Sequence, residues 1–215
     1  MHGVGPSGLL HAFGLDLAAR DGWNFGVKGE TGDLSDPLAG DFERKAISFS
    51  VGRSIEKIKY AGNVEWRKED GTQVGERTTW LVRNSFGYQI DPDWRFLGKL
   101  NFSVSDSNRG NSLNSDFTEA VAGYAWRPVD NDKVNALFKY TYYANQPSPA
   151  AISTAGVAAD YEQRSHILSI DAIYDVKPWL SVGGKYGFRR AEMRAPKTTG
   201  DWENADAHLL IGRAD

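Results

Sequence analysis

Residues 57–67 read KIKYAGNVEWR, and apolar and polar positions alternate along the whole stretch. Ile58, Tyr60, Val64 and Trp66 fall on even-numbered positions, and charged or small residues fall between them. Because successive side chains of a β-strand point to opposite faces, this period of two predicts a strand. One face of that strand is suited to lipid and the other face is polar, which is the pattern of a strand that crosses a membrane in a barrel.

Similar alternation recurs on both sides of this stretch. We expect further strands within residues 9–19, 23–28, 47–51, 77–90, 94–104, 120–126, 134–142, 166–174, 180–189 and 207–211. They bring the total to about eleven strands, and most are about 9–13 residues long, which suits a tilted crossing of the hydrocarbon core. In the last strand, Ala207, Leu209 and Ile211 form the apolar set.

The connections between these strands alternate in length. Short turns are expected at residues 21–22, 53–56, 91–93, 129–132 and 175–178, and longer polar loops at 31–41, 68–76, 106–116, 145–163 and 191–203. Short turns on one side and longer loops on the other are typical of outer-membrane barrels. The sequence therefore predicts an all-β fold, namely an antiparallel up-and-down transmembrane β-barrel. The eleven strands predicted in this chain would be part of a larger barrel. A soluble sandwich or solenoid is the alternative, but its strands are usually about 5–6 residues long.

Composition narrows the other possibilities. The chain has 215 residues, no cysteine and a formal net charge of −3. A chain of this length can form one sizeable domain. Without cysteine it cannot have a disulfide framework or a thiolate metal site. A net charge this close to zero does not favour a nucleic-acid partner. Gly3, Gly5 and Gly8 match the letters of a dinucleotide-binding motif, but no strand precedes them and no helix follows. We read residues 1–8 as a flexible lead-in, and residues 9–215 as the barrel domain.

Tryptophans recur beside the short turns. Trp23, Trp94 and Trp179 each lie at or just after such a turn. A single tryptophan there would be read as a strand-end core residue, but the recurrence favours an aromatic girdle at the periplasmic interface.

Basic side chains gather on the polar face of the predicted strands. This predicted lumen-lining set comprises Lys59, Arg67, Arg77, Arg83, Arg95, Lys99, Arg127, Lys139, Lys185 and Arg189. The acids expected on the same face are chiefly Glu65, Glu119, Asp171 and Asp206. A basic wall would favour small anions inside the barrel. The alternative is that these cations pair with acids on neighbouring strands or with a loop folded inward.

No catalytic, cofactor or metal site is predicted. The four histidines are scattered and lack metal-ligand spacing, and the acidic loops lack the ordered spacing of a calcium loop. Ser165 and His166 are adjacent, so their side chains would point to opposite faces of a strand. We therefore expect a protein that is not an enzyme.

Several runs resemble the C-terminal barrel regions of large Gram-negative outer-membrane proteins. They are TEAVAGYAWRPV at 118–129, NALFKYTY at 135–142, DPDWRF at 91–96 and KYGFR at 185–189. The resemblance implies a bacterial outer-membrane location, contact with lipid and lipopolysaccharide, and further domains of a larger parent protein. Such barrels end on an aromatic residue, whereas this chain ends with Gly212-Arg213-Ala214-Asp215. The resemblance therefore also implies a truncated region that lacks C-terminal strands.

The function expected from these observations is that of a porin-like channel or a membrane anchor. A surface interaction module, presented by the loop at residues 145–163, is the alternative, and a barrel enzyme is a further one.

Overall fold

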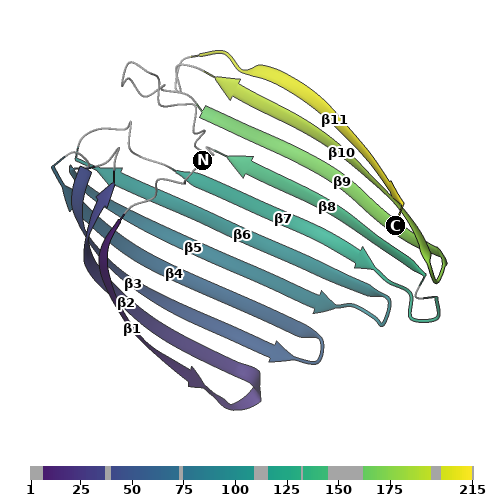
Figure 1. Cartoon of the computed structure of the whole chain (residues 1–215), viewed down its shortest axis with the longest axis horizontal. Helices are drawn as coiled ribbons and strands as arrows, with labels where there is room; N and C mark the ends of the chain where they lie inside the picture. Colours follow the sequence, from purple (N-terminus) through teal and green to yellow (C-terminus); the bar gives the residue numbers. More distant parts are fainter. Residues whose placement is uncertain are drawn as a thin grey trace.

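Eleven β-strands follow one another in a single antiparallel sheet, and each strand pairs with its neighbours in sequence (Figure 1). The computed structural model describes residues 7–36, 40–72, 75–108, 116–131, 133–144, 162–194 and 200–214. The strands are β1 (Ser7–Ala18), β2 (Trp23–Asp36), β3 (Gly40–Ile55), β4 (Ile58–Gly71), β5 (Gly75–Gln89), β6 (Trp94–Ser107), β7 (Phe117–Trp126), β8 (Val134–Ala144), β9 (Glu162–Lys177), β10 (Leu180–Arg194) and β11 (Glu203–Ala214). A short 3-10 turn, η1 (Arg20–Gly22), joins β1 to β2.

The strand register sorts the alternating side chains onto two faces. Tyr60 of β4 lies opposite Phe86 of β5, and Trp66 lies opposite Trp80. Residues directly opposite one another in an antiparallel pair share a face, so the apolar sets of neighbouring strands join into one apolar face. The predicted all-β, up-and-down architecture is confirmed.

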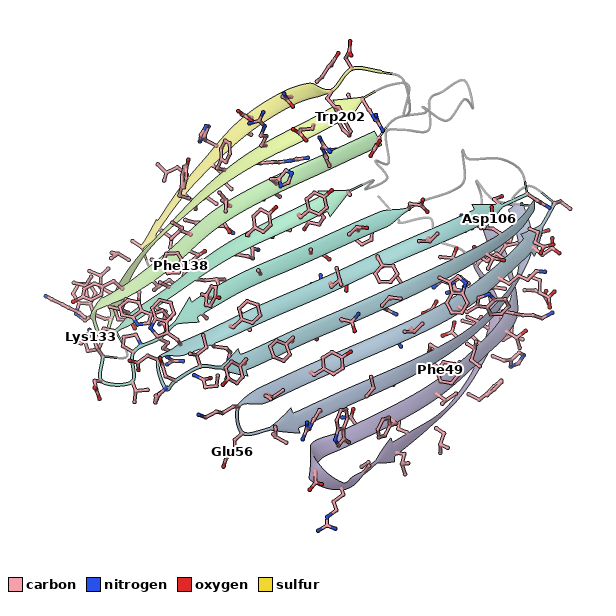
Figure 2. The ribbon with its side chains drawn as sticks, turned by 180° about the vertical axis from the view of Figure 1, so that it is seen from behind. Phe49, Glu56, Asp106, Lys133, Phe138 and Trp202 are labelled. Carbon is pink, nitrogen blue, oxygen red and sulfur yellow. The ribbon has the colours of Figure 1, made fainter. Side chains whose placement is uncertain are left out.

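The apolar face is convex and the polar face is concave. On the apolar face, large side chains such as Phe49 and Leu168 are 53% and 55% exposed, and Figure 2 draws Phe49 and Phe138 among the aromatic side chains. On the polar face, Glu69 and Ser165 are 4% and 2% exposed. Among the described residues Ala46 is the only buried apolar one, so this single-layer sheet has no apolar interior of the usual kind.

The sheet is open at both edges within the described ranges. β1 pairs with β2 alone, and β11 pairs with β10 alone. Figure 1 shows these strands at the two margins of the curved sheet. No helix among the described residues is long and apolar enough to cross a membrane.

Two predicted loops are mostly strand. β2 runs on to Asp36 and β3 begins at Gly40, within the loop expected at 31–41. Likewise β4 reaches Gly71 and β5 begins at Gly75, within the loop expected at 68–76. The strand ends carry polar side chains on both faces, so alternation disappears there while the backbone still pairs across the sheet. Residues 145–161 and 109–115, in two other predicted loops, lie outside the described residues.

In the last strand, the side chains that point to each face also differ from the prediction. Leu210 of β11 lies opposite Tyr186 of β10, and Asp206 lies opposite Arg190. This register places Leu210 and Asp206 on the convex face, and Leu209 and Ile211 on the concave face. Leu209, Leu210 and Ile211 are consecutive apolar residues, so the sequence period could not show which of them faces outward. The strand register with β10 decides it.

Candidate functional site

An apolar band crosses the convex face between two polar margins. On β4 it runs from Ile58 to Trp66 and is followed by Lys68, and on β6 it runs from Trp94 to Val104 and is followed by Asp106. At about 3.3 Å per residue these stretches are roughly 26–33 Å long. With a strand tilt of about 40°, their height is roughly 20–25 Å, which is close to the apolar band of outer-membrane barrels.

Tryptophans mark the short-turn margin of this band. Trp23 and Trp94 are the first residues of β2 and β6, and Trp179 lies between β9 and β10 and is 71% exposed. The guanidinium of Arg53 lies 4.9 Å from the Trp23 ring centroid. Amphipathic rings beside cationic groups are suited to the level of lipid headgroups.

A further tryptophan joins this margin. Trp126, the last residue of β7, lies opposite Trp94, and their ring centroids are 6.1 Å apart. The sequence pattern named Trp23, Trp94 and Trp179 for the interface but not Trp126. The turn that follows it at Arg127-Pro128 was the signal available.

The long-loop margin combines aromatic and hydrogen-bonding groups. The hydroxyl of Tyr140 lies 2.8 Å from Nδ1 of His166, and that of Tyr186 lies 2.9 Å from Nδ1 of His208. Beyond them, the Trp202 ring lies under the guanidinium of Arg164 at 4.1 Å. Figure 2 places Trp202 and Asp106 at this end of the sheet, and Glu56 and Lys133 at the short-turn end.

One polar residue, Asn84, interrupts the apolar band. The Tyr60 hydroxyl donates a 2.8 Å hydrogen bond to Oδ1 of Asn84. Gly62 lies between them, because a Cβ on Gly62 would stand 2.5 Å from that hydroxyl and 3.0 Å from Oδ1. The glycine therefore leaves the space in which the Asn84 amide is satisfied.

The concave face carries the predicted basic set. The register places Lys59, Arg67, Arg77, Arg83, Arg95, Lys99, Lys139, Lys185 and Arg189 on this face. Arg127 follows the end of β7. The basic set therefore shares the face that the alternation indicated.

Part of this set is neutralised by carboxylates. Arg67 and Arg83 approach Glu65 at 2.5 Å and 3.4 Å. Nε of Arg77 donates to Glu69 at 2.9 Å, and Lys99 lies 2.7 Å from Glu119. Glu69 was not among the acids expected on this face, because the sequence placed it in a loop.

The rest of the set has no such partner. In the described part of the chain, no carboxylate lies within 4.0 Å of the cationic groups of Lys59, Arg95, Arg127, Lys139, Lys185 or Arg189. Arg95 donates instead to Gln89 at 3.0 Å, and Arg189 donates to Ser165 at 3.1 Å.

Paired and unpaired cations are segregated along β4–β6. Arg67 and Arg77 lie toward the long-loop end with their carboxylates, whereas Lys59 and Arg95 are each the second residue from the short-turn end of their strands. Around Lys59 and Arg95 the concave face forms a hollow of 930 Å³, which extends across β2–β6. Five basic side chains belong to its concave lining, namely Lys57, Lys59, Arg83, Arg95 and Lys99, and Glu56 is the one acidic residue of the lining. Arg53 also borders the hollow, but its guanidinium lies against the Trp23 ring on the convex face. The hollow is therefore positive.

The described residues contain no cluster of histidine, aspartate or glutamate arranged to hold a metal ion. Ser165 lies on the concave face, and His166 lies on the convex face opposite Tyr142. The two side chains therefore do not meet, as the sequence indicated.

Comparison with known proteins supports the fold. No protein-family profile and no curated protein matches the sequence. Among solved structures, the chain is similar to the ferric citrate transporter FecA in the unliganded form, with 12% identity and a TM-score of 0.59 over 95% of this chain and 38% of that protein. It spans well under half of FecA.

Two further structures overlap the sheet more loosely. Pseudomonas aeruginosa OccK1 has 14% identity and a TM-score of 0.45 over 95% of this chain and 59% of its own. Acinetobacter baumannii OccAB4 has 10% identity and a TM-score of 0.45 over 93% and 56%. These proteins and FecA are outer-membrane β-barrel proteins. The overlap with FecA shows that the chain has the fold of such a barrel wall.

Proposed function

We propose that this chain is part of the wall of a β-barrel in the outer membrane of a Gram-negative bacterium, and that the barrel is a porin-like channel which prefers anions. The observation that carries the proposal is the contrast between the two faces. An exposed apolar band covers the convex face, and unpaired cations line the concave one. The similarity to FecA supports the barrel architecture, and its limited coverage is consistent with a larger parent barrel.

The convex face favours a lipid partner. Phe13 and Leu15 are 69% and 73% exposed, and Leu168 and Phe49 more than half exposed. Each Å² of apolar surface left in water forgoes about 25 cal/mol, and soluble proteins rarely present such surface in a continuous patch. Hydrocarbon removes this cost. At the long-loop margin, the tyrosine, histidine and arginine side chains would meet lipopolysaccharide.

The concave face favours anions over cations. Along β4–β6, ion pairs offset the charge of Arg67 and Arg77 toward the long-loop end, whereas Lys59 and Arg95 leave the short-turn end positive. Lys139, Lys185 and Arg189, on β8 and β10, add further positive charge to the concave face with no carboxylate within 4.0 Å among the described residues. A wall of one charge raises the local concentration of counter-ions beside it, and rings of Arg and Lys favour anions in pores. No catalytic step is part of this proposal.

Reversal potentials test the proposal. The full-length protein is inserted into planar bilayers, and the zero-current potential is measured under a KCl gradient. We expect chloride preference, reduced in Lys59→Gln and Arg95→Gln. Lys45→Gln, which removes a convex-face charge beside Glu43, should leave the potential unchanged. Preference for potassium would refute the anion channel, and a barrel that inserts without any conductance would be an anchor.

A further inference from the structure

We propose that the hollow on β4–β6 is a binding site for a small organic anion with two carboxylate groups, held in a cradle above Gly87. The inference rests on the proposed function, because it requires the concave face to meet water, but it adds a discrete site to a general preference for anions.

The floor of the cradle is the backbone at Gly87. Lys59 of β4 and Leu97 of β6 lie on either side of Gly87 in the register. A Cβ placed on Gly87 would have its nearest neighbour at 3.8 Å, the carbonyl oxygen of Lys59. This is an ordinary van der Waals distance, so a side chain would fit at Gly87. Without one, a ligand can approach the backbone more closely here than above a larger residue.

Cations surround this floor without carboxylates of their own. Lys57, Lys59 and Arg95 line the hollow and are exposed, and within the described residues no acid lies within 4.0 Å of their charged groups. In contrast, Lys99, on the long-loop side of the hollow, already binds Glu119, and Arg83 shares Glu65 with Arg67. The cations without any carboxylate are those beside Gly87.

Arg95 is held in place rather than loosely extended. Its Nε donates to Oε1 of Gln89 at 3.0 Å, and the amide nitrogen of Gln89 donates to the carbonyl oxygen of Asp91 at 2.6 Å. This chain of hydrogen bonds ties the guanidinium to the turn after β5. It leaves the terminal nitrogens of Arg95 available, and a guanidinium binds a carboxylate best through two parallel hydrogen bonds.

The spacing of the cations indicates a ligand with two anionic groups. Lys59 lies directly opposite Gly87, whereas Arg95 lies opposite Gln89, two residues nearer the turn. Two strand spacings and this offset place the backbones of Lys59 and Arg95 roughly 12 Å apart. Both side chains are long enough to extend toward one ligand between them. A dicarboxylate with a short carbon chain can contact both cations at once, whereas a monocarboxylate can contact only one.

Binding can be measured without any current. The full-length protein in detergent micelles is titrated calorimetrically with succinate, and with acetate as the monocarboxylate probe. We expect succinate to bind up to about fivefold more tightly than acetate, since one additional exposed ion pair contributes up to about 1 kcal/mol. Lys59→Gln and Arg95→Gln should each weaken succinate binding by a similar factor and leave acetate binding less affected.

Gly87→Leu distinguishes a discrete binding site at Gly87 from a general attraction of anions to a positive surface. The substitution keeps every charge but fills the open floor, so we expect it to weaken succinate binding at least as much as Lys59→Gln. Lys45→Gln, the control on the convex face, should have no effect. Succinate binding that survives Gly87→Leu, or that equals acetate binding, would overturn the site. A barrel that binds succinate in this pattern but does not conduct would refute the proposed channel and leave the site standing.

Discussion

Ile170 offers a direct test of whether the convex face meets lipid. It lies on β9 between Phe138 of β8 and Tyr186 of β10 and is 46% exposed. It is six residues from Val176 and four from His166, near the two margins of the apolar band. At about 3.3 Å per residue and a tilt of about 40°, these separations correspond to depths of roughly 15 Å and 10 Å. Ile170 thus lies near the middle of the expected hydrocarbon layer.

We expect Ile170→Arg to destabilise the membrane-inserted protein by about 3 kcal/mol, because lipid-facing Arg near the bilayer midplane costs about 2–4 kcal/mol in outer-membrane barrels. Ser169→Arg is the matched control, since Ser169 is the preceding residue and faces the concave side opposite Lys139. Repulsion from the like charge of Lys139 is the main cost expected for Ser169→Arg, and it should be at most about 1 kcal/mol.

The assay is reversible guanidinium unfolding of the full-length protein in phospholipid vesicles, followed by tryptophan fluorescence. The informative quantity is the difference between the two variants, which should be about 2 kcal/mol or more. If the difference is within about 0.5 kcal/mol, which is usual for exposed substitutions on a soluble protein, the convex face does not meet lipid and the assignment of the band fails.

Two further predictions concern single contacts. Tyr60→Phe removes the hydroxyl that donates the 2.8 Å hydrogen bond to Asn84 and should lower the free energy of unfolding by about 1–2 kcal/mol. Adding Asn84→Leu should recover much of this stability, and additive effects of the two changes in vesicle unfolding would contradict the contact. Glu69→Ala removes the carboxylate that pairs with Arg77, on a residue that is 4% exposed, and should lower the free energy of unfolding by about 2–3 kcal/mol. In a protein that already carries Arg77→Met, the same change should cost less. An equal cost in the same assay would show that the pair contributes nothing to stability.

The alternation of side chains was a sound guide wherever one face of the sheet is apolar. The apolar set from Ile58 to Trp66 is regular, and the prediction of two unlike faces is confirmed for it. Where both faces carry polar side chains, the alternation disappears. For that reason the strand ends near Asp36 and Gly71 read as loops, although the structure pairs them.

The pattern of charge on the concave face could be predicted only in part. Alternation identified which cations share the face. Which cations form ion pairs depends on the strand register, which places Glu69 of β4 directly opposite Arg77 of the adjacent strand β5. Asp206 was assigned to the wrong face because Leu209, Leu210 and Ile211 break the alternation. The hollow beside Gly87 is lined by residues from five strands, β2 to β6, and no local stretch of sequence contains that information.

The length of the strands has a consequence for the rate at which solutes are captured. β3 spans 16 residues, or about 53 Å, and therefore about 40 Å in height at a tilt of about 40°. About 15 Å would rise above the lipid as a collar, and the charges of the collar are largely matched in pairs such as Lys45–Glu43 and Lys68–Glu76. A neutral collar gives little long-range steering, and its field is screened within about 10 Å at ordinary salt. We therefore expect anions to arrive by unassisted diffusion, with entry rates that change little with ionic strength, and to be selected only after they have passed the collar.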